Sequence, residues 1–121
     1  LIGDVLDYMN IVTHAIKLVS DHLERADEAS NINPVVEELL MLIKDENRPL
    51  SAEETAKEVS RILMSHESPA LDDNFISSFY RKMARFCEKN NLYGATEFFL
   101  SKYAENISGD RLQEKTRNRN L

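Results

Sequence analysis

Glycine, proline and tryptophan are scarce in this sequence, and long hydrophobic runs are missing. Its 121 residues include three glycines, three prolines and no tryptophan. An all-β fold, with its many turns, would need more glycine and proline than this. The longest uninterrupted apolar run, Leu39–Ile43, is far shorter than the roughly 20 residues that a membrane-spanning helix needs. The composition therefore predicts a helical protein that does not bind membranes.

Cysteine occurs once, at Cys87. A single cysteine excludes an intramolecular disulfide and a cysteine-based metal cluster. Chains without disulfides are typical of reducing compartments. We therefore expect a cytoplasmic protein, or one from another reducing intracellular compartment.

Catalytic and metal-binding motifs are also missing. The three histidines, His14, His22 and His66, form neither a Glu-x-x-His nor a His-Glu-x-x-His pattern. Three scattered glycines cannot build a phosphate loop or a nucleophile elbow. Cys87 lies late in its expected helix, far from the N-terminal end that would activate a thiol, and is expected to be a small core residue. We expect no catalytic residue, metal or cofactor, and hence a protein that is not an enzyme.

The formal net charge is −6, which argues against a general nucleic-acid binder. The charge is unevenly distributed along the chain. Residues 1–30 contain six acids and two bases, and residues 31–70 contain eight and four. Residues 71–109 are balanced at five each, and residues 110–121 contain two acids and four bases. The acidic first half is expected to attract the less acidic second half within the fold.

The most regular pattern in the chain is an apolar heptad seam near its beginning. Its spacing alternates between three and four residues through Ile2, Val5, Met9, Val12, Ile16, Val19, Leu23 and Ala26. This spacing keeps apolar side chains on one narrow face of a long helix, predicted over Asp4–Ala26. Ile11 and Leu18 lie off the seam, so this helix should contact more than one neighbour. We expect the other helices to pack around it and to cover the seam.

Four more helices follow from capping signals and apolar spacing. Asn33-Pro34 and the capping box Ser51-Ala52-Glu53-Glu54 predict two helix starts. A further helix is predicted from Asp72 or Asp73 to Lys89. This helix and the one after it carry most of the aromatic side chains of the protein. That last helix is predicted from Leu92 to Ile107, with a stop at Ser108-Gly109.

The predicted fold class is all-α: an antiparallel bundle of four to five helices joined by short loops. We expect residues 1–109 to form a single helical-bundle domain. Residues 110–121 are basic and contain few apolar side chains. They are predicted to be a frayed or disordered C-terminal tail.

Two sets of residues are candidates for partner binding. Arg81, Lys82, Arg85 and Lys89 share the polar side of the fourth predicted helix. They could contact an acidic partner or phosphate groups, or they could form a solvated face that pairs with the acidic helices. The second predicted helix is apolar nearly all round, and its candidates are Val35, Val36 and Leu40. Such a short helix is either central in the core or exposes an adhesive face.

The first two predicted helices have more apolar surface than one neighbour would cover, and the sequence contains no recognisable group of catalytic residues. Together these features favour a non-enzymatic protein–protein interaction module. We expect an adaptor, regulator or small chaperone that binds a protein partner or a second copy through its helix faces. The alternative is a nucleic-acid-associated regulatory protein. It would use the basic face of the fourth helix together with the C-terminal tail.

Overall fold

The computed structural model confirms an all-α fold. It describes the backbone of residues 2–26, 33–45 and 51–119, and the side chains of residues 5–26, 33–45 and 51–108. These residues form five helices and no strand. The helices are α1 (Ile2–Arg25), α2 (Pro34–Lys44), α3 (Ala52–Ser65), α4 (Asp73–Lys89) and α5 (Tyr93–Arg119). None of them is long and apolar enough to cross a membrane within the described part of the chain.

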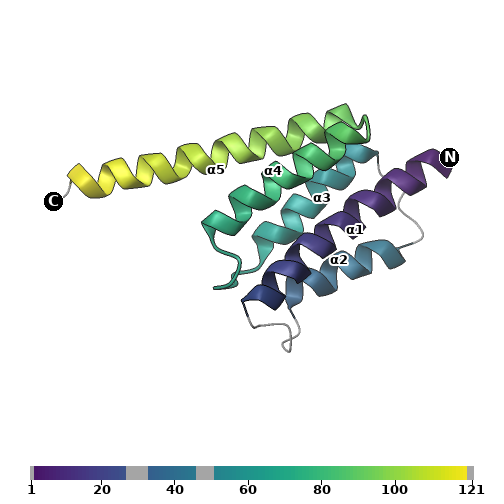
Figure 1. Cartoon of the computed structure of the whole chain (residues 1–121), viewed down its shortest axis with the longest axis horizontal. Helices are drawn as coiled ribbons and strands as arrows, with labels where there is room; N and C mark the ends of the chain where they lie inside the picture. Colours follow the sequence, from purple (N-terminus) through teal and green to yellow (C-terminus); the bar gives the residue numbers. More distant parts are fainter. Residues whose placement is uncertain (1, 27–32, 46–50, 120–121) are drawn as a thin grey trace.

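Consecutive helices run in opposite directions (Figure 1). Helix α1 packs against α3 and α4, and α5 packs against the same two helices from the other side. These four helices therefore form a closed ring, in which α1 lies diagonally opposite α5 and α3 lies diagonally opposite α4. Helix α2 packs outside the ring, against α1 and α3.

Side-chain caps define where three of the helices begin. The Asn33 carboxamide accepts a hydrogen bond from the Val35 N–H at 2.9 Å, which confirms the predicted start of α2. The Ser51 hydroxyl accepts one from the Glu54 N–H at 3.2 Å, and so caps α3 as predicted. The Asp72 carboxylate accepts one from the Phe75 N–H at 2.9 Å at the start of α4.

The turn between α4 and α5 is tight and depends on asparagine. Asn91 has φ of 60°, in the left-handed region that asparagine adopts more readily than most residues. The N–H of Leu92 then donates to the Cys87 carbonyl at 2.9 Å. This turn brings α5 back along α4, and these two helices make the most extensive contact in the molecule.

The heptad seam on α1 is covered along only part of its length. Val12, Val19 and Leu23 are buried, but Val5 and Met9 are 54% and 39% exposed. Helix α2, one of the three helices that pack against α1, has 11 residues against 24 in α1, or about 16 Å against 36 Å. Helix α2 is therefore too short to cover α1 along its whole length. The expectation that neighbours cover the whole seam is wrong for these first turns.

The centre of the bundle is filled by residues that lie off this seam as well as on it. On α1, Tyr8, Ile11 and Ala15 are buried, and the helix contacts three neighbours, as the off-seam apolar residues predicted. The largest fully buried side chains are Phe79 of α4 and Phe99 of α5. The concentration of buried aromatic volume on these two helices agrees with the sequence pattern.

Helix α5 differs from its predicted end. A stop was expected at Ser108-Gly109, but the helix continues to Arg119 and extends past the beginning of α4 (Figure 1). A glycine inside a helix costs only about 1 kcal/mol relative to alanine, so it weakens a helix without ending it. The side chains of residues 109–121 lie outside the described residues, and the division of the chain at residue 110 stays a prediction.

Candidate binding surfaces

The predicted basic face is exposed and lies along α4. Arg81, Lys82 and Arg85 line a shallow cleft of about 370 Å³, together with Ser77, Ser78 and Tyr103. Lys89 is exposed but does not line this cleft. None of these four basic side chains forms an ion pair with any residue that the structure describes.

Other basic side chains of the bundle do find partners. The Arg61 guanidinium lies 2.5 Å from the Glu58 carboxylate, and this bond raises the Arg61 pKa. Lys57 and Lys102 also lie within ion-pair distance of a glutamate on their own helix. The expectation that the acidic helices neutralise the basic face of α4 is therefore not met within the described residues. Its cations remain available to a ligand.

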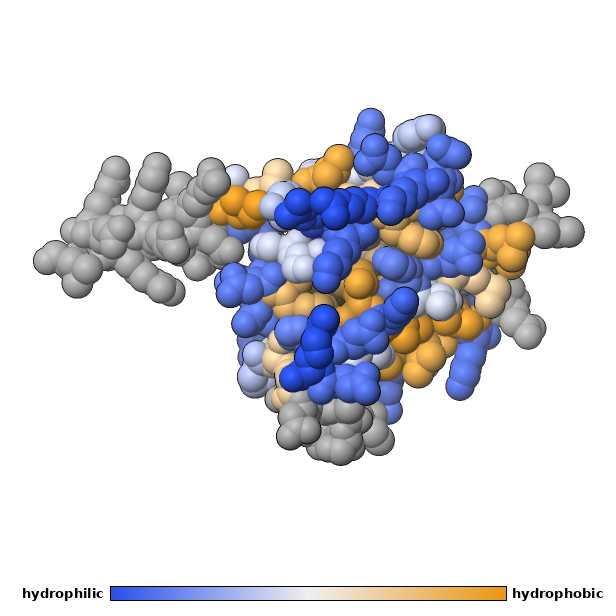
Figure 2. All heavy atoms as spheres, viewed as in Figure 1, coloured by the Kyte–Doolittle hydropathy of each residue, from blue (hydrophilic) through white to orange (hydrophobic). Residues whose placement is uncertain are grey.

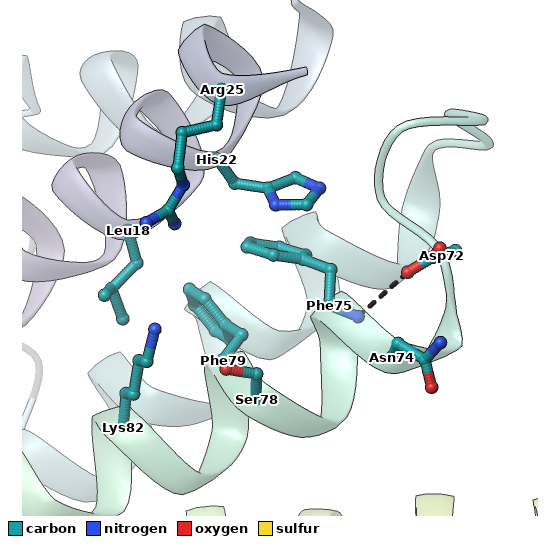
Figure 3. Close-up of a pocket in the computed structure, with 9 residues that line it drawn as sticks. All are labelled: Leu18, His22, Arg25, Asp72, Asn74, Phe75, Ser78, Phe79 and Lys82. Carbon is teal, nitrogen blue, oxygen red and sulfur yellow. Dashed lines mark hydrogen bonds between the residues drawn. The ribbon is translucent and has the colours of Figure 1, made fainter.

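A second cleft adjoins the first, between α1 and α4 (Figure 3). Its volume is about 290 Å³. The lining residues are Leu18, His22 and Arg25 from α1, and Asp72, Asn74, Phe75, Ser78, Phe79 and Lys82 from α4 and its N-cap. Lys82 and Ser78 line both clefts. Arg25 was not predicted as a site residue, because only the packing of α1 against α4 brings it near Lys82.

His22 is held firmly in the wall of this second cleft. Its Nε2 lies 2.6 Å from the Ala70 carbonyl oxygen, so Nε2 carries a hydrogen and donates it. Its ring stacks on Phe75 with the ring centroids 4.3 Å apart. Only Nδ1 is therefore left for solvent or a ligand.

The other two histidines have structural partners. His14 stacks on Phe86, with centroids 4.2 Å apart, and burial, with a smaller contribution from Lys17, lowers the His14 pKa. His66 Nε2 lies 2.5 Å from a Glu38 carboxylate oxygen and so ties α3 to α2. The described residues contain no group of three acidic, histidine or cysteine side chains able to hold a metal ion.

Cys87 is fully buried in the core, as predicted. Burial raises the pKa of its thiol to about 12. A thiol that stays protonated at neutral pH is a poor nucleophile. In this fold Cys87 therefore acts as a small apolar residue.

The three apolar candidates on α2 have different environments. Val35 is 0% exposed and belongs to the core, so its assignment as a partner-binding residue is wrong. Val36 is half-buried against the core, and Leu40 is 43% exposed. Because α2 packs against both α1 and α3, the face that carries Val35 is already covered by the chain itself.

The structure adds further exposed apolar residues to the sequence candidate Leu40. Five of the eight large apolar side chains exposed in the described residues belong to α1 and α2. We call them the α1–α2 apolar patch: Val5, Leu6, Met9, Leu40 and Met41. The Tyr8 hydroxyl donates to the Leu42 carbonyl, which places the beginning of α1 beside the end of α2. Figure 2 shows hydrophobic surface over α2 and, at the same end of the molecule, over the beginning of α1.

Comparisons of this chain with protein families, with curated proteins and with solved structures find no match.

Proposed function

We propose that this protein is a non-enzymatic interaction module that binds a protein partner, or a second copy of itself, through the α1–α2 apolar patch. The observation that carries the proposal is the uncovered beginning of the heptad seam, where Val5 and Met9 are exposed. A heptad seam is complementary to another helix, and covering it would extend the packing that α2 already makes further along α1. The function is that of an adaptor, regulator or small chaperone.

The position of the patch supports this proposal. Isolated exposed apolar side chains are ordinary, but a group of them on adjoining elements marks an interaction surface in many proteins. Leu40 and Met41 lie close to the end of α2, next to the uncovered turns of α1. Cys87, the side chain best suited to nucleophilic chemistry, is buried and protonated. Binding is therefore the activity for which these surfaces are suited.

The test compares the variant Met9→Gln/Leu40→Gln with Leu100→Gln, a matched control on α5 whose side chain is 49% exposed. Self-association is measured by light scattering, and exposed apolar surface is measured by binding of a hydrophobic dye. We expect the double variant to reduce both signals and the control to change neither. A wild-type protein that is strictly monomeric and binds no dye, or equal effects of the two variants, would refute the proposal.

A nucleic-acid-associated regulatory protein is the second candidate, and the unpaired cations of α4 favour it. Arg81, Lys82 and Arg85 line one cleft without an acidic residue in its lining. Reversing the charge at Arg81, Arg85 and Lys89 to glutamate should abolish binding to an oligonucleotide, and the wild-type binding should weaken steeply with salt. Oligonucleotide binding that is absent, or that survives the charge reversal, would remove this candidate.

A further inference from the structure

Two cations face each other in the cleft between α1 and α4. Figure 3 shows the Arg25 guanidinium and the Lys82 ammonium directed into the cleft from opposite walls. Neither is in an ion pair with a described residue. Two positive charges that line one cleft repel each other. An anion bound between them adds an attraction to each cation and so offsets this repulsion.

The single carboxylate in the lining is already used elsewhere. Asp72 lies at the end of the cleft away from Lys82 (Figure 3). It caps α4 by accepting the Phe75 N–H at 2.9 Å. It therefore does not neutralise Arg25 or Lys82, and the Lys82 end of the cleft is positive.

A hydroxyl group also lines this cleft. The Ser78 hydroxyl lines the cleft one helical turn before Lys82 on α4. His22 forms part of the opposite wall, where its Nε2–H is already donated to the Ala70 carbonyl and its ring stacks on Phe75. A guanidinium, an ammonium and a hydroxyl that line one cleft can donate to the several oxygens of a phosphate group.

We propose that this cleft is a binding site for a small phosphorylated ligand, whose phosphate lies between Arg25 and Lys82. The cleft volume of about 290 Å³ suits a small molecule. A nucleic-acid backbone would follow the basic face along α4, which includes Lys82 but not Arg25, so a need for Arg25 favours the small ligand. Arg25 and Lys82 instead converge across a groove between two helices. This site is independent of the α1–α2 apolar patch, so either proposal can fail without the other.

The probes are inorganic phosphate and glycerol 3-phosphate, titrated against sodium chloride at equal ionic strength. Binding is followed on the full chain by amide chemical shifts in two-dimensional NMR. The variants are Arg25→Gln, Lys82→Gln and the control Lys89→Gln, an exposed base of α4 outside the cleft. We expect saturable shifts confined to residues around 18–25 and 72–82. Each cleft variant should weaken binding by about tenfold, and the control should leave it unchanged.

Four results would overturn the proposal. The first is no saturable shift beyond that caused by sodium chloride. The second is an equal loss in Lys89→Gln, which would assign the effect to diffuse charge. The third is a single-stranded oligonucleotide that displaces phosphate and binds more tightly with each added nucleotide, which would favour a nucleic-acid surface. The fourth is a marked loss of thermal stability in the cleft variants without phosphate, which would give both cations a structural role.

Discussion

A buried hydrogen bond across the bundle provides the sharpest test of the fold. The Ser60 hydroxyl oxygen of α3 lies 2.8 Å from the Tyr80 phenolic oxygen of α4. Both residues are buried, and their helices are diagonal in the ring, without close backbone contact. This hydrogen bond therefore spans the centre of the bundle and links the two helices that do not pack directly against each other.

The two single substitutions should have different costs. Ser60→Ala leaves the Tyr80 hydroxyl buried without a partner, which should lower the free energy of unfolding by about 1–3 kcal/mol. Tyr80→Phe should cost less, about 0.5–1.5 kcal/mol, because a serine inside a helix can donate instead to the carbonyl one turn earlier. In the double variant no buried hydroxyl is left alone. Its cost should be smaller than the sum of the single costs by about 1 kcal/mol.

The assay is urea unfolding followed by the helical circular dichroism signal. Burial raises the Tyr80 pKa, so the phenol stays protonated at neutral pH. The wild type, the two single variants and the double variant can therefore be compared at that pH. Tyr103→Phe is the matched control, because the half-buried Tyr103 hydroxyl makes no hydrogen bond to a described residue. Single costs that add up to the cost of the double variant would refute the reasoning, since the two hydroxyls would then not interact.

Three further predictions concern single residues. Cys87, with a pKa raised to about 12 by burial, should react with a thiol reagent only after unfolding, and rapid labelling of folded protein would contradict this. Because the folded His14 pKa is lowered from 6.5, the unfolded chain binds more protons in the window just below that value, so stability should fall as pH drops through it. His14→Gln should reduce this dependence of the free energy of unfolding on pH, as measured by urea unfolding. An unchanged pH dependence would show that His14 is not its cause. Ser51→Ala should cost about 1 kcal/mol through loss of the α3 cap, whereas Ser101→Ala, at an exposed position inside α5, should cost nothing; equal losses would contradict the capping argument.

The sequence alone determined the local structure of this protein. The caps at Asn33 and Ser51 were readable because a capping side chain lies within three residues of the N–H from which it accepts a hydrogen bond. The burial of Cys87 was predicted as well, because the position of a residue within its own helix is also a local property. The end of α5 was misplaced at Ser108-Gly109, because one glycine carries too small a cost to stop a helix by itself.

Only the tertiary structure decided which surfaces remain free. Val5 and Val35 look equally apolar in the sequence, yet Val5 is 54% exposed and Val35 is buried. Val35 belongs to a helix that packs against both α1 and α3, whereas Val5 lies in a turn of α1 that its neighbours leave exposed. Arg25 and Lys82 share a cleft because α1 packs against α4, and no local pattern encodes that pairing. Helix formation depends on neighbours along the chain, whereas the coverage of a surface depends on the lengths and positions of helices distant in sequence.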